Sequence, residues 1–132
     1  MAAIIPFNEH LCISQALASD ESAKEGLFRL KWKEAYANSS GSFHGGALMA
    51  FADAAMSRVL KARLPAGKRF STLHMGSTFV ASGAGDIGIS VAIVKIGNRI
   101  AHCTASITAA DGKLLFNATA TFAIAAESRI GG

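Results

Sequence analysis

The 132-residue sequence contains few of the residues that mark several classes of protein. Its 2 cysteines, Cys12 and Cys103, are too few for a disulfide scaffold and too far apart for a CxxC or zinc pattern. With 1 Trp and 1 Tyr, few rings could stack on bases, and the basic residues are dispersed. A nucleic-acid partner is therefore not expected. The net charge of +4 still suits a small ligand with an anionic tail.

Long hydrophobic runs are also missing from the sequence. Asp, Lys, Arg or Gly interrupts each apolar stretch before it reaches the roughly 20 residues of a membrane-spanning helix. The segment 1–6 lacks a basic region and reaches Pro6 before a signal-peptide core could form. Together with the low cysteine content, these patterns predict a soluble cytoplasmic protein without a membrane partner.

Apolar residues are abundant, at 51% of the chain, which is enough for a core in one domain of this length. Residues 8–19 predict a short helix. Alternating apolar and basic residues over 27–36 predict a half-buried strand, and a polar loop follows at 37–43. Residues 44–64 are rich in Ala, Leu and Met and predict a long central helix that is buried on most of its sides.

The remainder of the chain shows a period of two. It predicts four strands, at 69–80, 86–96, 99–110 and 113–124, with a two-residue hairpin turn at Asp111-Gly112. One strand, one long helix and four further strands predict an α+β fold, in which an antiparallel sheet wraps around the helix. No linker or repeat divides the chain, so a single domain over 1–132 is expected, with its core at about 26–124.

Asp53 is the first candidate for a chemical role. It is the one residue between Ala47 and Met56 that is not apolar, and burial of a carboxylate is costly unless something compensates. Desolvation would raise the pKa of Asp53 and make the carboxylate more basic. A second interpretation is that Asp53 faces a solvent gap or a buried donor and only fixes the helix position. The residues alone favour neither.

His44-Gly45-Gly46, at the predicted start of the long helix, is the second candidate. Glycine pairs form helix poorly, so their presence indicates that some group approaches the backbone closely. Free amides at a helix N-terminus also suit a carbonyl oxygen that becomes an oxyanion. The alternative is a turn with a flexible helix entrance. An oxyanion site and a carboxylate on one helix together favour acyl-transfer hydrolysis.

Other motifs do not fit their structural context. Gly83-Ala-Gly85-Asp-Ile-Gly88 matches GxGxxG but lies between two strands, so it does not indicate a dinucleotide site. His102 and Cys103 would point to opposite faces of a strand. Ser57 lacks a GxSxG motif, and the histidines show no metal-ligand spacing. No metal site is expected.

The pattern Asn38-(x5)-His44-Gly45-Gly46-(x6)-Asp53, followed by Ser71-Thr72 and by Gly97-Asn98-Arg99, resembles the hotdog-fold acyl-CoA thioesterases of the PaaI-like branch. The resemblance spans about 26–124. It implies a hotdog fold, a homodimer or homotetramer, an acyl-CoA substrate, an active site at the dimer interface, and no cofactor besides the CoA of the substrate.

The resemblance also implies roles for individual residues. The Gly45 N–H would polarise the thioester carbonyl, and Asp53 of the opposite subunit would act as general base or nucleophile. Asn38 would orient substrate or water, His44 would support the loop by hydrogen bonding, and Ser71 would assist near Asp53.

Cationic residues are candidates for binding the CoA phosphates. The foremost are Arg58, Arg69 and Arg99, and further ones are Lys61, Arg63 and Lys68. The acyl pocket is expected to be lined by residues such as Phe51, Met56, Leu73 and Phe79. Alternatives to a thioesterase are a hotdog protein that binds acyl-CoA without turnover and a hotdog hydratase or dehydratase. The sequence identifies neither the acyl group nor its carrier, CoA or acyl carrier protein.

Overall fold

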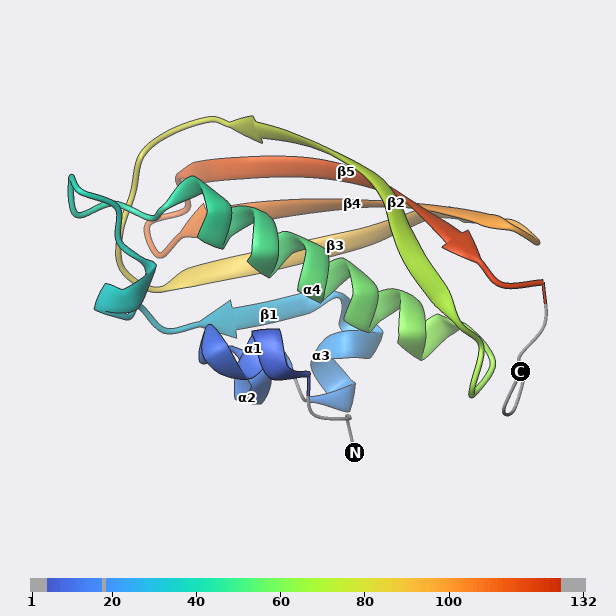
Figure 1. Cartoon of the computed structure of the whole chain (residues 1–132). Helices are drawn as coiled ribbons and strands as arrows, with labels where there is room; N and C mark the ends of the chain where they lie inside the picture. The colour runs from blue at the N-terminus through green and yellow to red at the C-terminus, as the bar shows by residue number, and fades with distance from the viewer. Residues whose placement is uncertain (1–4, 18, 127–132) are drawn as a thin grey trace.

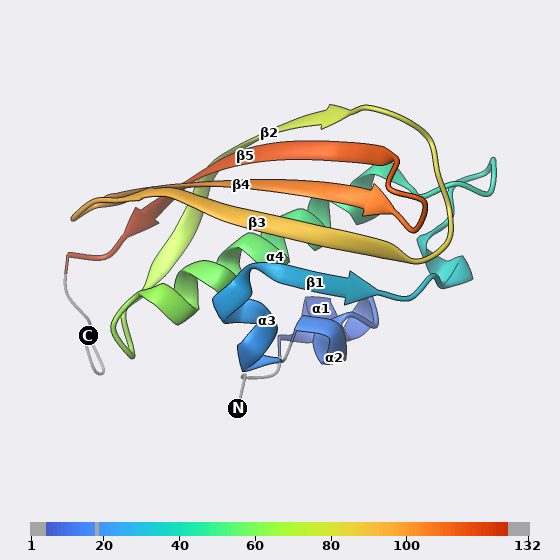
Figure 2. The same cartoon turned by 180° about the vertical axis from the view of Figure 1, so that it is seen from behind.

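The computed structural model describes residues 5–17 and 19–126. A five-stranded antiparallel sheet curls around the long helix α4 (Gly45–Arg63), as Figure 1 shows from one side and Figure 2 from behind. The strands are β1 (Leu27–Leu30), β2 (Phe70–Phe79), β3 (Ile87–Ile96), β4 (Ile100–Ala109) and β5 (Leu114–Ile124), in the order β1-β3-β4-β5-β2. The expected hotdog architecture is confirmed.

The long helix and the last four strands lie within one residue of their predicted bounds. His44 caps α4 at its start, and the helix ends before Leu64 and Pro65. The Asp111 side chain accepts a hydrogen bond from the Lys113 N–H (3.0 Å), and Gly112 takes a φ of 89°, so the β4–β5 turn follows the sequence signal. Among the described helices, none is long and apolar enough to cross a membrane.

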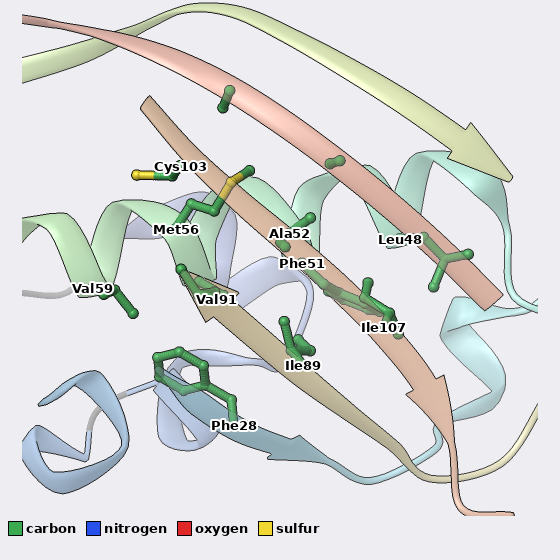
Figure 3. Packing of buried hydrophobic residues seen from close by; sticks show 14 of the residues in the cluster. Phe28, Leu48, Phe51, Ala52, Met56, Val59, Ile89, Val91, Cys103 and Ile107 are labelled. Atoms are coloured by element: carbon green, nitrogen blue, oxygen red, sulfur yellow. The ribbon is translucent and has the colours of Figure 1, made fainter. Parts of the chain in front are cut away.

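The core lies between the concave face of the sheet and one face of α4. The helix buries Leu48, Phe51, Ala52, Ala55, Met56, Val59 and Leu60, which recur every three or four residues. Figure 3 shows part of this face packed against Ile89, Val91, Cys103 and Ile107 of the sheet. Burial of each large side chain contributes about 1.5–3 kcal/mol. The opposite face of α4 carries Asp53 and is only partly covered, so the prediction of burial on most sides was too broad.

The N-terminal region differs from the single helix expected at 8–19. It forms three short helices, α1 (Pro6–His10), α2 (Ser14–Leu17) and α3 (Asp20–Glu25). Cys12 has a φ of 60°, which is not helical, so the helix is interrupted between α1 and α2. The sequence did carry a signal for α3, because Ser19 caps it (Ser22 N to Ser19 Oγ, 3.2 Å) and Gly26 ends it in a left-handed conformation.

The first strand is shorter than predicted. Leu27–Leu30 pair with Ile87–Ser90, and β3 begins at Ile87, so the ladder offers no partner beyond Leu30. The Trp32 N–H instead donates to the Asp86 carboxylate (2.8 Å), and the 3-10 helix η1 (Glu34–Tyr36) follows. The alternation of residues over 27–36 therefore describes a strand only in its first half.

Candidate active site

The start of α4 carries the backbone amide that was expected to bind an oxyanion. Gly45 is the first helical residue, and amides in the first turn have no acceptor within the helix. None of the described residues accepts a hydrogen bond from the Gly45 N–H. The partial positive charge of the helix N-terminus therefore remains available to a ligand oxygen.

Both glycines at this helix start lie close to a ring. A Cβ on Gly45 would come within 3.0 Å of the Phe79 ring, and a Cβ on Gly46 would come within 3.0 Å of His44 Nδ1. His44 Nδ1 accepts a hydrogen bond from the Gly46 N–H (2.9 Å), so its proton resides on Nε2 in the neutral ring. The Gly-Gly pair thus reflects close approach to the backbone.

The loop before α4 is organised by Asn38. Its Oδ1 accepts hydrogen bonds from the N–H groups of Ser40 (2.9 Å) and Ser42 (3.1 Å), and its Nδ2 donates to the Phe43 carbonyl (3.5 Å). The His44 N–H donates to the Tyr36 carbonyl (2.7 Å). Asn38 therefore holds the loop that precedes Gly45, and its hydrogen bonds with the described residues all stay within that loop.

Asp53 lies on the face of α4 that the sheet leaves open. Asp53 is partly buried and is not sealed in an apolar environment. Asp53 borders a cavity of about 320 Å³, and its Oδ1 accepts a hydrogen bond from the Thr72 hydroxyl (2.9 Å). These surroundings match the interpretation in which Asp53 faces a gap or a hydrogen-bond donor, since the cavity is the gap and the Thr72 hydroxyl is the donor.

The residue beside Asp53 is Thr72 rather than Ser71. Successive side chains of a strand point to opposite faces, so only one of this pair can point at the helix. A bulge between Thr72 and His74 then shifts the register of β2 against β5. The sequence signal was the Ser71-Thr72 pair itself, and its register could not be assigned without the bulge.

The basic candidates fall into two separate places. Arg69 lies at the C-terminal end of α4 beside Lys61 and Lys68, where a groove of about 610 Å³ also includes Arg58. Arg99 lies in the β3–β4 turn and is not part of this groove.

Arg58 is already engaged within the fold. Its Nε donates to the Leu17 carbonyl (3.0 Å), and its Nη2 forms a salt bridge with Asp20 Oδ1 (2.6 Å). The same contact lowers the pKa of Asp20, first by the hydrogen bond from Arg58 and then by its charge. Arg58 therefore ties α4 to the N-terminal helices, and its role as a phosphate ligand stays a prediction.

Ser57 lines the cavity beside Asp53, whereas Cys103 and His102 lie away from it on the sheet. Burial raises the pKa of the Cys103 thiol to about 11, so it is a poor nucleophile. His102 pairs instead with Thr121 (Nδ1 to Oγ1, 3.2 Å) on an exposed part of the sheet. Across the residues that the structure describes, no three His, Cys, Asp or Glu side chains gather into a possible metal site.

The residues expected to line the acyl pocket lie in two different places. Phe51 and Met56 are sealed in the core, whereas Leu73 and Phe79 are exposed on β2. The cavity beside Asp53 is lined by other apolar residues, among them Phe7, Leu17, Ala50, Ala54 and Phe70. None of the four expected residues lines this cavity, and their part in an acyl pocket stays a prediction.

Comparisons with known proteins place this geometry in a family. The model of the acyl-CoA thioesterase N-terminal domain matches residues 34–123. No match was found among the curated proteins.

Three solved structures illustrate the likeness in fold. A Bacillus halodurans protein solved with CoA is 23% identical, with a TM-score of 0.72 over 78% of this chain and 68% of its own. A hypothetical thioesterase of Streptococcus pneumoniae solved with coenzyme A is 21% identical (TM-score 0.70; 80% and 83%). Zebrafish thioesterase superfamily member 2 is 24% identical (TM-score 0.70; 75% and 73%).

These identities support a common fold, and the family model supplies the assignment. It runs from η1 almost to the end of β5. The matched residues include Asn38 in the loop before α4, the Gly45 amide, Asp53 and Thr72. The chain belongs to the acyl-CoA thioesterase family, with a hotdog fold.

Proposed function

We propose that this protein hydrolyses acyl-CoA thioesters to a carboxylic acid and free CoA. One observation carries the proposal: α4 presents an amide without an acceptor at its start, Gly45, and an acceptor carboxylate beside a cavity, Asp53. Thioester hydrolysis needs a donor for the carbonyl oxygen and a group that accepts a proton or attacks the carbonyl carbon. The family assignment supports this use of the two groups.

Two copies of the chain are needed to bring these groups to one thioester. Gly45 and Asp53 are eight residues apart on one helix, or about 12 Å along its axis, which exceeds the size of a carbonyl group. We therefore propose a homodimer, alone or paired into a tetramer, in which each site combines Gly45 of one protomer with Asp53 of the other.

The edge strand β2 supports a second copy as the partner. It is ten residues long, it lies at the end of the sheet, and it bears exposed apolar side chains at Leu73 (59%) and Phe79 (54%). A long apolar edge strand is a template for pairing with another chain. Phe79 also lies against Gly45, so this edge adjoins the oxyanion site.

The proposed reaction has two possible forms. In one, Asp53 removes a proton from water, the water oxygen attacks the carbonyl carbon, and the C–S bond breaks to release CoA thiolate, which takes up a proton. In the other, an Asp53 oxygen attacks the carbonyl carbon and displaces the thiolate, and water then hydrolyses the resulting anhydride. In both forms the Gly45 N–H stabilises the negative oxygen, while Asn38 and His44 hold the loop that positions it.

The anionic part of CoA has two candidate sites. Arg69, with Lys61 and Lys68, lines the groove at the end of α4, and Arg99 stands in the β3–β4 turn. Exposed guanidinium groups can bind phosphate oxygens bidentately. We propose these residues as phosphate ligands.

Thiol release from an acyl-CoA panel tests the function. We expect wild-type protein to release thiol from phenylacetyl-, hydroxybenzoyl-, hexanoyl- or palmitoyl-CoA, and Asp53→Ala and the isosteric Asp53→Asn to lower kcat by about 10² or more. The preferred acyl group also tests the expected PaaI-like branch. Binding of acyl-CoA with no thiol release by the wild type would favour a non-catalytic binding protein. Turnover that survives Asp53→Ala would remove Asp53 from the mechanism.

A further inference from the structure

The cavity beside Asp53 lies between two parts of the chain with different origins. One wall comes from the open face of α4 and includes Ala50, Asp53 and Ala54. The facing wall comes from the N-terminal segment and includes Ile5, Phe7 and Leu17. The family model begins at residue 34, so this second wall lies outside the common domain.

The N-terminal wall is anchored to the domain through α2, α3 and the segment before α2. Ile13 and Leu17 are buried in the core at 1% and 5% exposure, and Arg58 of α4 holds the Leu17 carbonyl and Asp20. Figures 1 and 2 show α1, α2 and α3 gathered beside α4 and β1. The cavity is therefore a feature of the folded chain.

The walls indicate the chemistry of the occupant. Next to Asp53 the α4 wall is small and apolar at Ala50 and Ala54, and the opposite wall carries the large apolar side chain Phe7, which is 59% exposed. Further along α4 the cavity is lined by polar and charged side chains, Ser57, Arg58 and Lys61. Large apolar side chains beside an open cavity favour an apolar ligand. The cavity of about 320 Å³ is roughly twice the 150 Å³ that suffices for benzene in a dry engineered cavity.

We propose that the N-terminal segment 5–17 sets the acyl-group specificity of this protein, with Phe7 and Ala54 as the size-determining residues. The cavity takes an uncharged aryl or medium-chain acyl group, which is larger than acetyl and shorter than palmitoyl. This inference rests on the proposed thioesterase function, since it assigns the site of the acyl group in that reaction.

Two opposite substitutions test the assignment by kcat/KM for acetyl-, hexanoyl- and palmitoyl-CoA. Ala54→Leu fills the cavity and is expected to lower the hexanoyl-to-acetyl ratio about tenfold. Phe7→Ala enlarges it and is expected to raise the palmitoyl-to-hexanoyl ratio about tenfold. Val94→Ala is the control, because Val94 is an equally apolar exposed residue (65%) on β3 that is not among the residues lining the cavity. Its ratios should match those of the wild type.

The outcomes separate this inference from the proposed function. If the wild type hydrolyses the panel and neither ratio moves, the specificity assignment is overturned while the thioesterase function stands. If no thiol is released at all, the function fails, and the cavity is tested by calorimetry with the non-hydrolysable thioether hexyl-CoA. A Kd weakened about tenfold by Ala54→Leu then supports the acyl site, and an unchanged Kd overturns it. Since Phe7 is exposed, Phe7→Ala keeps the test available if Ala54→Leu does not fold.

Discussion

Thr72 determines where the Asp53 carboxylate points, because its hydroxyl donates the hydrogen bond that the structure assigns to Asp53 Oδ1 (2.9 Å). We expect Thr72→Val to lower kcat about tenfold with little change in KM. A hydrogen bond to a charged group is worth about 1.5–3 kcal/mol, and the isosteric valine leaves Asp53 without this donor. Thr72→Ser keeps the hydroxyl and should restore most of the rate. Steady-state thiol release measures all three proteins.

Ser71→Ala provides the matched comparison for that prediction. Ser71 lies next to Thr72 on β2, so the two side chains point to opposite faces of the sheet. We expect a rate close to that of the wild type. A loss of kcat in Ser71→Ala together with normal turnover in Thr72→Val would contradict the assignment and return the role to Ser71.

At the residue scale, the sequence predicted side chains better than their surroundings. Asp53 stood out because its neighbours are apolar, but those apolar residues form two faces of α4, and only one of them packs on the sheet. Arg58 is a candidate phosphate ligand by its charge, but nothing near it in the sequence indicates its partner Asp20, 38 residues away. Contacts of this range depend on the fold, so a local pattern does not contain them.

Gly26 joins α3 to β1 in the one conformation that the junction allows. Its φ is +73°, and a Cβ at this position would collide with the Val91 carbonyl oxygen. We expect Gly26→Ala to lower the free energy of unfolding by more than about 2 kcal/mol, because the left-handed strain of about 1–2 kcal/mol adds to the collision. Urea unfolding measures the change.

The control for Gly26 is a glycine with the same backbone strain and open space around it. Gly112 has a φ of +89°, and nothing lies within 4 Å of its added Cβ. Gly112→Ala should therefore cost about 1–2 kcal/mol, for the backbone strain alone. Equal losses in the two variants would show that the Val91 contact relaxes and does not constrain the junction.

The salt bridge between α3 and α4 should make stability depend on pH. The Arg58 hydrogen bond and charge lower the pKa of Asp20 below its ordinary value of 3.8, so the folded protein binds fewer protons than the unfolded chain. The stabilisation is complete above pH 3.8 and is lost as the pH falls through the folded-state pKa. We expect Asp20→Asn to be less stable than the wild type at pH 7, with the difference shrinking below pH 3.8.

Urea unfolding across this pH range measures the effect, and Glu21→Gln is the control. Asp20 and Glu21 both lie in the first turn of α3, so both interact with the helix dipole, but the salt bridge with Arg58 belongs to Asp20. A loss of stability of the same size in both variants would mean that the dipole, and not Arg58, is responsible.

At the element scale, periodicity correctly predicted the long helix and the last four strands, because the local sequence pattern of each is sufficient to define it. The helix at 45–63 and the strands from Phe70 onward have unbroken patterns with clear turns between them. The segment before Leu27 does not. Three helices of four to six residues are too short to show a period, and they are stable only because Ile13 and Leu17 pack into the core.

At the scale of the whole molecule, the question is whether Gly45 and Asp53 of one active site come from the same protomer or from two. If each site uses Gly45 of one protomer and Asp53 of the other, two inactive variants should restore activity when mixed. Gly45→Pro removes the donor N–H at the first helical position, where proline is tolerated, and Asp53→Ala removes the carboxylate. Each heterodimer then contains one site with both native groups and one site with neither.

We expect the two inactive proteins, unfolded and refolded together, to recover about one quarter of the wild-type thiol release, because random pairing in a symmetric dimer gives half heterodimers, each with one of its two sites intact. Gly45→Ala is the matched control, since it adds the same crowding against Phe79 but keeps the N–H, and it should retain activity on its own. If both groups act within one protomer, every site in the mixture lacks one of them. No activity would then return, and this result would exclude the shared site. The two groups of one protomer would then have to act on one substrate although they lie about 12 Å apart along α4.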